Sequence, residues 1–205
     1  MLPGFSGLHM EKRRDPVFRI AKTAAHLVLP FFFRVETYGL ENLPRRSAFV
    51  LLPKHQRWED IPLLGIVTPR PLYYIAKSEL FDSPVTNWLL RSMGGIPLNR
   101  QRPLVSRRYL LTTIGLLKKG EGVVVFPEGT YHRDEMGKGH IGIVRLIATR
   151  LSLPFIPVGI HYSSGKGRTL VSIKFGKPCY KEPDLAPIGF FDYMMQEIAT
   201  LSGLI

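Results

Sequence analysis

Two short polar segments follow apolar runs that are typical of buried strands, and both carry side chains suited to catalysis. The first contains His55 and, five residues later, Asp60. Histidine suits proton transfer near neutral pH, and a carboxylate bonded to its far ring nitrogen would fix the tautomer and stabilise the imidazolium. Five residues is a poor helical spacing, so the pair requires a turn that leads into the helix predicted at 61–67. The competing interpretation is a histidine in a solvent-exposed loop.

The second segment, Phe126-Pro127-Glu128-Gly129-Thr130, directly follows the β-branched run Val123–Val125. It supplies a carboxylate and a hydroxyl, and Gly129 permits a backbone turn or the close approach of a ligand. The competing interpretation is an ordinary turn at the end of a strand. Neither segment identifies a reaction by itself.

Short apolar runs alternate with helical patterns along most of the chain, which predicts the framework for these segments. Strand-like runs occupy 47–52, 72–76, 95–98, 122–126, 155–161 and 170–175. Helical patterns occupy 61–67, 84–92, 104–119, 140–151 and 190–202, and a further helix is predicted from Asp15-Pro16 towards Pro30. The alternation favours an α/β domain with a largely parallel or mixed β-sheet covered by helices. In such sheets the site lies beyond the carboxyl ends of the strands.

Together with two further blocks, the polar segments resemble the glycerolipid acyltransferase family typified by 1-acylglycerol-3-phosphate (lysophosphatidate) acyltransferases. The His-x4-Asp block is matched by His55 and Asp60, and the Gly-x-Ile-x-x-x-Arg block is matched at 94–100. The Phe-Pro-Glu-Gly-Thr block is matched at 126–130, and the Pro-rich strand is matched at 153–158. The likeness covers about residues 35–180.

The resemblance implies direct acyl transfer without a covalent acyl-enzyme. His55 would act as general base on the acceptor hydroxyl, with Asp60 orienting it. In this family the arginine of the second block and the Glu-Gly-Thr of the third are associated with binding the acceptor's phosphate and glycerol, here Arg100, Glu128, Gly129 and Thr130. A guanidinium forks well onto phosphate, and we expect Glu128 to position Arg100 or an acceptor hydroxyl. Structural roles at the site are expected for Pro127 and Pro157.

The function implied is acyl transfer from acyl-CoA or acyl-carrier protein to the hydroxyl of 1-acylglycerol-3-phosphate, forming phosphatidic acid, with no cofactor and no metal. Three departures from the family leave the acceptor headgroup open. Lys54 stands where many members have Asn, Arg57 where many have Ser, and Tyr131-His132 replaces the usual Arg-Ser. The alternatives are the same fold acting on another lysolipid, or a non-catalytic basic module that binds anionic lipid or nucleic acid.

The charge balance indicates an anionic partner, because 28 Lys and Arg oppose 16 Asp and Glu and give a net charge of +12. No acidic residue occurs between Asp82 and Glu121. The apolar run Ala24–Phe33 is too short to span a bilayer, so we expect a peripheral protein on the cytoplasmic face of an anionic membrane, without nucleic acid as a partner. The predicted division is a basic segment and interfacial helix at 1–33 and an acyltransferase domain at 34–205.

Two further patterns carry little weight. The glycines of 137–142 match a dinucleotide fingerprint, but no strand directly precedes them and no acidic residue follows at the required distance. Cys179 is the single cysteine, which excludes a disulfide within the chain.

Overall fold

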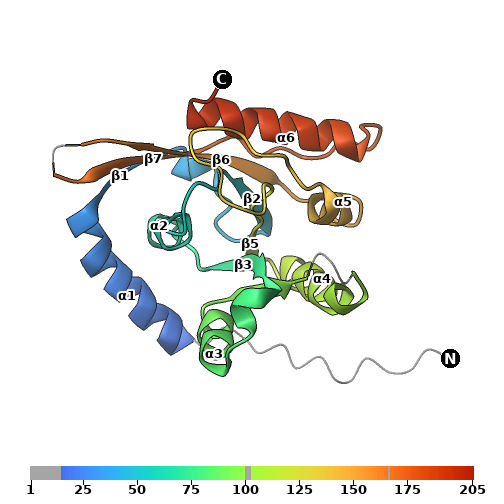
Figure 1. Ribbon diagram of the computed structural model, residues 1–205. Coiled ribbons are helices and arrows are strands. Elements are labelled where there is room, and N and C mark those ends of the chain that lie inside the picture. The colour runs from blue at the N-terminus through green and yellow to red at the C-terminus, as the bar shows by residue number, and fades with distance from the viewer. Residues whose placement is uncertain (1–14, 100–102, 166) are drawn as a thin grey trace.

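A seven-stranded sheet with helices on both faces forms the framework of the protein (Figure 1). The computed structural model describes residues 15–99, 103–165 and 167–205. The strand order is β1-β7-β6-β2-β5-β3-β4, and its pairs are parallel except for the antiparallel pair β6–β7. The predicted mixed α/β architecture is therefore confirmed.

Six of the strands lie where the apolar runs predicted them. They are β2 (Phe49–Pro53), β3 (Leu72–Lys77), β4 (Gly95–Leu98), β5 (Gly122–Val124), β6 (Phe155–Ser163) and β7 (Thr169–Phe175). The seventh, β1 (Phe33–Tyr38), was not predicted, because Arg34 and Glu36 interrupt its apolar residues. It lies at the edge of the sheet and pairs in parallel with β7.

The predicted helices are also present; α3 has the predicted ends, and the ends of the others are shifted. They are α1 (Asp15–Phe32), α2 (Asp60–Val67), α3 (Pro84–Ser92), α4 (Pro103–Lys118), α5 (Gly142–Ala148) and α6 (Pro187–Ser202), with short 3₁₀ turns at Leu40–Asn42 and Ser78–Phe81. Helix α1 continues past the predicted end at Pro30, whose carbonyl accepts a hydrogen bond of 3.0 Å from the Arg168 guanidinium.

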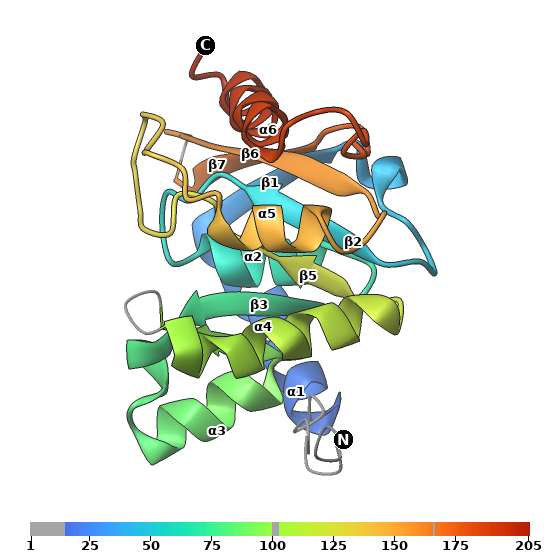
Figure 2. The ribbon, with the colours of Figure 1, turned by 90° about the vertical axis from the view of Figure 1, so that its right-hand side faces the viewer.

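The helices bury both faces of the sheet (Figure 2). Helices α1 and α2 cover one face, where Leu29, Leu63 and Leu64 pack into one hydrophobic core. Helices α4, α5 and α6 cover the other, where Ile114, Ile147 and other apolar side chains form a second core. The central strands are buried on both sides, which explains their unbroken apolar sequence.

The topology brings the polar segments to one edge of the sheet. Strands β2, β5, β3 and β4 run parallel, so their carboxyl ends lie side by side. His55 follows β2 and the block at 126–130 follows β5. Across the described ranges, no helix is both long and apolar enough to cross a bilayer.

Candidate active site

The imidazole of His55 is bonded to the carboxylate of Asp60. Its Nδ1 lies 3.0 Å from Asp60 Oδ2, and both side chains are buried. Because a carboxylate accepts, Nδ1 carries the proton and donates it, which leaves Nε2 as the basic nitrogen. Within the described part of the chain, no group is hydrogen-bonded to Nε2. The pair thus has the geometry of a general base with an orienting carboxylate.

A tight turn between His55 and Asp60 brings the two side chains together despite their five-residue spacing. Asp60 is the first residue of α2, where a negative charge is favoured by the helix dipole. Its Oδ2 also accepts the backbone N–H of Gln56 at 2.7 Å and of Arg57 at 2.9 Å. These bonds fold the segment between the strand and the helix back onto the carboxylate, so that Oδ2 reaches the His55 ring.

Tyr162 completes the environment of the carboxylate. Its hydroxyl donates a hydrogen bond of 2.6 Å to Asp60 Oδ1. Burial raises the pKa of Tyr162 strongly, and the charge of Asp60 raises it further, so the phenol stays protonated and remains the donor. Asp60 therefore accepts four hydrogen bonds and is held in one orientation.

Two aromatic rings contact the imidazole of His55. Phe126 stacks on it with centroids 3.8 Å apart, and Tyr131 meets it edge-on at 4.4 Å. Phe126 is buried, whereas Tyr131 is 51% exposed. Phe126 thus covers one side of the imidazole with a buried ring, and the exposed Tyr131 ring lies at another side.

A buried ion pair lies directly behind the histidine. Lys54 Nζ is 2.8 Å from both oxygens of Glu128, and the two side chains have no exposed surface. Glu128 also accepts the backbone N–H of His55 at 3.0 Å and of Gly137 at 2.8 Å. The carboxylate therefore joins the strand end that carries His55 to the loop that follows β5. Its expected contact with Arg100 or with the acceptor stays a prediction.

The loop 127–141 packs against the catalytic turn through several hydrogen bonds. The backbone N–H of His132 donates to His55 O at 2.9 Å, and Lys54 Nζ donates to His132 O at 2.7 Å. Gln56 extends the contact, because its Oε1 accepts the Asp134 N–H at 3.2 Å. A Cβ on Gly137 would overlap the ring of His132. A side chain at this glycine of the dinucleotide-like pattern would therefore require the His132 ring to move.

The other predicted residues of the third and fourth blocks lie in the turn after β5 and in strand β6. Gly129 has a φ of 67°, a left-handed turn that favours glycine, and Thr130 next to it is exposed. Pro127 accepts the backbone N–H of His140 at 2.8 Å, which closes the loop. Pro157 lies in β6 opposite Leu52 and accepts the Gly176 N–H at 2.8 Å. Both prolines have structural contacts, and the roles of Gly129 and Thr130 in binding stay predictions.

Arg100 lies outside the described residues, directly after Asn99 at the end of the β4 segment. An apolar cavity of about 560 Å³ adjoins the block at 126–130 and is lined by residues of β3, β4, α4, α5 and the strand end that carries Phe126. Its wall includes Leu98, Leu110, Ile143 and Leu146. In the described part of the chain, no group of three His, Cys, Asp or Glu side chains is arranged to hold a metal ion.

The fold and this site define a known class of protein. The model of the Acyltransferase family matches residues 34–161. The chain therefore belongs to this family and is an O-acyltransferase of lipid synthesis.

Relatives of known function agree with this assignment. The chain is 32% identical over 152 residues to the 1-acyl-sn-glycerol-3-phosphate acyltransferase of Bacillus subtilis, which covers 73% of this chain and 74% of that protein. The crystal structure of the 1-acyl-sn-glycerophosphate acyltransferase of Thermotoga maritima matches with a TM-score of 0.69 and 27% identity, over 93% of this chain and 77% of that one.

Two Pseudomonas aeruginosa proteins are longer, and the chain spans about half of each. A 1-acyl-sn-glycerol-3-phosphate acyltransferase is 37% identical over 128 residues, 61% of this chain and 48% of that protein. A lyso-ornithine lipid O-acyltransferase is 29% identical over 137 residues, 65% of this chain and 49% of that protein.

Lys54 and Tyr162 are site residues whose roles the sequence analysis did not predict. Lys54 was noted only as a departure from the family pattern. The sequence did contain a sign of its ion pair, because Lys54 and Glu128 each follow the end of a predicted buried strand. Tyr162 shares the buried face of β6 with Ile160, so the alternation of that strand points it at α2. Tyr162 continues the apolar face of this strand in the sequence, and this pattern could have indicated that its hydroxyl is buried.

Proposed function

We propose that this protein transfers a fatty acyl group from acyl-CoA or acyl-carrier protein to the hydroxyl of 1-acylglycerol-3-phosphate, forming phosphatidic acid. The observation that carries the proposal is the His55–Asp60 pair, with Nδ1 bonded to a fully buried carboxylate. The names of the Bacillus subtilis and Thermotoga maritima relatives support this acceptor.

In the proposed reaction, His55 Nε2 removes the proton of the acceptor hydroxyl while the hydroxyl oxygen bonds to the carbonyl carbon of the thioester. The carbon–sulfur bond then breaks, and the thiolate leaves with the proton from the imidazolium. The imidazolium is stabilised by Asp60, whose carboxylate lies 3.0 Å from Nδ1. Ester and thiol are the products, and no cofactor takes part in these steps.

The acyl chain of the donor has a suitable place beside the histidine. The cavity of about 560 Å³ is lined in part by Phe126, whose ring stacks on His55. Its walls are mainly aliphatic, and hydrocarbon is favoured there over water. We assign this cavity to the fatty acyl chain, because the thioester carbonyl must lie next to Nε2.

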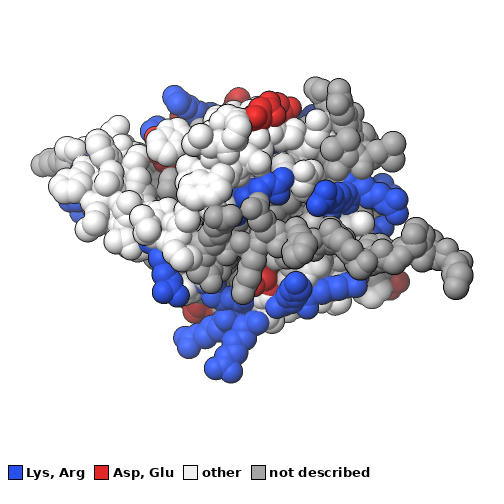
Figure 3. Space-filling view, turned by 90° about the horizontal axis from the view of Figure 1, so that it is seen from below, with Lys and Arg blue, Asp and Glu red and all other residues white. Residues whose placement is uncertain are grey.

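Membrane docking would bring the acceptor to the site. One face of α1 packs on the core through Leu29, and its opposite face exposes Ile20, Leu27, Val28, Phe31 and Phe32. Helix α3 exposes Val85 and Leu89 nearby, and Arg107 and Arg108 are exposed on α4. Figure 3 shows uncharged surface on this side of the molecule, with many Lys and Arg and fewer Asp and Glu around it. An apolar face bordered by cations suits an anionic interface, here proposed as the cytoplasmic face.

Sedimentation with vesicles tests the docking surface. Phe31→Ser/Phe32→Ser should weaken binding to vesicles that contain anionic lipid, and binding should fall as salt is raised. Arg150→Gln, which removes an exposed charge just after the end of α5, is the control. Equal binding to neutral and anionic vesicles by all three proteins would contradict the docking proposal.

A second acceptor deserves testing because one relative is named a lyso-ornithine lipid O-acyltransferase. A non-catalytic basic module is disfavoured, since it gives no reason for a buried Asp60 with four hydrogen bonds next to a histidine.

In the direct test, the purified protein is incubated with an acyl donor, either acyl-CoA or acyl-carrier protein, and with each of a panel of lysolipids. The products are identified by mass spectrometry. Phosphatidic acid should form fastest from 1-acylglycerol-3-phosphate. If another lysolipid is acylated faster, that lysolipid is the acceptor instead of 1-acylglycerol-3-phosphate. If no donor and acceptor pair gives an acylated product, the proposal is overturned.

A further inference from the structure

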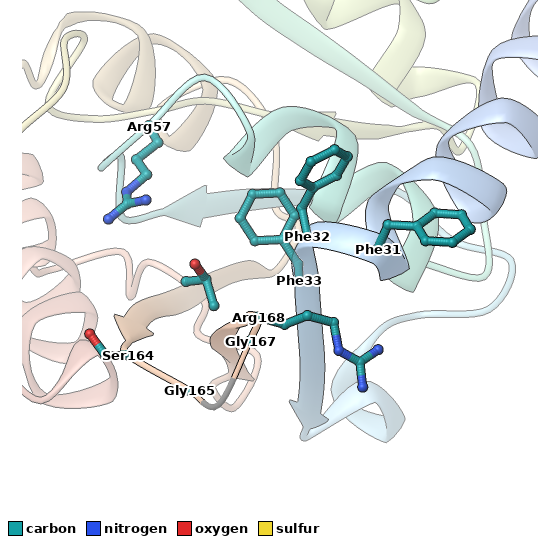
Figure 4. Close-up of a pocket in the computed structure, with 9 residues that line it drawn as sticks. Phe31, Phe32, Phe33, Arg57, Ser164, Gly165, Gly167 and Arg168 are labelled. Carbon is teal, nitrogen blue, oxygen red and sulfur yellow. The ribbon is translucent and has the colours of Figure 1, made fainter.

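A second hollow, of about 470 Å³, lies beside the catalytic turn (Figure 4). Phe31, Phe32 and Phe33, at the junction of α1 and β1, form its apolar side. Its polar side contains Arg57 together with Ser164 and Thr169 of the β6–β7 hairpin. The hollow is therefore amphiphilic: the Phe33 ring faces the Arg57 side in Figure 4, whereas the Phe31 ring is directed away from it.

Arg57 has an unusual environment for a charged side chain. Its guanidinium lies 4.4 Å from the centroid of the Tyr162 ring. Its Nε is buried and has no hydrogen-bond partner, and within the described ranges its side chain forms no ion pair. A buried donor is normally paired, so a partly buried guanidinium without a carboxylate is suited to an anion that arrives with a ligand.

The position of Arg57 ties this hollow to the reaction centre. Arg57 follows His55 by two residues, and its backbone N–H donates to Asp60 Oδ2 at 2.9 Å. The ring beneath its guanidinium belongs to Tyr162, whose hydroxyl bonds the other oxygen of Asp60. A headgroup bound at Arg57 would thus lie against the residues that orient the general base.

The apolar side of the hollow opens to the docking surface described above. Phe31 is 76% exposed and Phe32 is 61% exposed, whereas Phe33 packs against Tyr162 with ring centroids 6.4 Å apart. An amphiphile with a single chain and an acidic headgroup matches this order of surfaces: its chain would lie over the phenylalanines and its anion would meet Arg57.

We infer that Arg57 contacts the acidic headgroup of the acceptor lysolipid from this hollow, in addition to the contact that the family resemblance predicts for Arg100, and selects acceptors by charge. The inference rests on the proposed function and deepens its acceptor side. Arg168 has a different role, because its guanidinium donates to Pro30 O at 3.0 Å and points away from Arg57 in Figure 4. It shapes the rim of the hollow and stabilises the end of α1.

The kinetic test compares acceptors of different charge. Arg57→Gln should raise the KM for lysophosphatidate about 10- to 100-fold, the range for losing a hydrogen bond to a charged group. The KM for the acyl donor should change less than twofold. The preference for lysophosphatidate over uncharged 1-monoacylglycerol should fall by the same 10- to 100-fold. Arg57→Lys should recover part of the loss, since an ammonium keeps the charge without the fork.

The matched control is Arg150→Gln, which removes the same charge from an exposed site on another part of the surface. It should leave both acceptor KM values within twofold of the parent. Lyso-ornithine lipid serves as a third acceptor, because its acidic group is a carboxylate rather than a phosphate. A selective loss with either acidic acceptor supports the role of Arg57, and the acceptor affected identifies the headgroup.

A binding measurement separates this inference from the proposed function. In a His55→Ala background, a short-chain lysophosphatidate is titrated while tryptophan fluorescence is followed, since Trp58 neighbours Arg57 and is exposed. Adding Arg57→Gln should weaken this binding at least about tenfold relative to binding of monoacylglycerol. That result would support Arg57 even if the parent formed no phosphatidic acid. Equal weakening for charged and neutral lipid, or no weakening for either, would overturn the inference.

Discussion

Replacing Lys54 by Met tests whether the buried ion pair holds the catalytic turn in place. The substitution keeps most of the side-chain length and removes the ammonium that bonds both oxygens of Glu128 at 2.8 Å. The carboxylate then remains buried with two backbone donors, from His55 and Gly137. Breaking one side of a buried pair costs about 3–5 kcal/mol, so Lys54→Met should lower the free energy of unfolding by that amount.

Urea denaturation followed by circular dichroism measures this loss, and acyl transfer is assayed on the same samples. Lys54→Met/Glu128→Gln should be more stable than the sum of the single changes predicts, because no buried charge is left unpaired. Lys22→Met is the control, since within the described ranges Lys22 Nζ donates to a backbone carbonyl, Thr68 O, at 3.0 Å and to no carboxylate. A Lys54→Met protein within about 1 kcal/mol of the parent would refute the reasoning.

Three further changes probe the surroundings of the pair. Tyr162→Phe removes the hydroxyl that bonds Asp60 and should lower kcat up to about tenfold, the range for one hydrogen bond, without changing either KM; an unchanged kcat would contradict its positioning role. Asp60→Asn should lower kcat more than Tyr162→Phe does, because it removes the charge opposite the imidazolium; the reverse order in steady-state kinetics would contradict this. Gly137→Ala should lower the melting temperature, since the added Cβ overlaps the His132 ring; an equal or higher melting temperature in calorimetry would argue against that packing.

Much of the fold was predictable because its strands are short, apolar and separated by amphipathic helices. Strand β4, for example, was predicted with the ends that the structure gives it. Strand β1 was missed because it lies at an edge, half buried, and its polar residues obscure the pattern. Helix α5 is shorter than the predicted 140–151, and the His140 N–H, before its start, bonds Pro127 O across the loop. Such long-range bonds leave no local signal.

The site was predictable where a motif and a strand end coincide. His55 and Asp60 met this condition, and the turn between them was required by their spacing. Lys54 and Tyr162 were missed because their partners, Glu128 and Asp60, lie 74 and 102 residues away along the chain. Only the pairing of β2 with β5 and β6 brings these groups together.

The central claim is that His55 is the general base of acyl transfer, and His55→Ala tests it most directly. Product formation from the best donor and acceptor is followed by mass spectrometry, with circular dichroism and melting to establish that the variant is folded. A folded His55→Ala protein should lose about 10²- to 10⁴-fold in kcat, the typical contribution of a general base. A folded variant that retains more than half of the parent's rate would contradict the account.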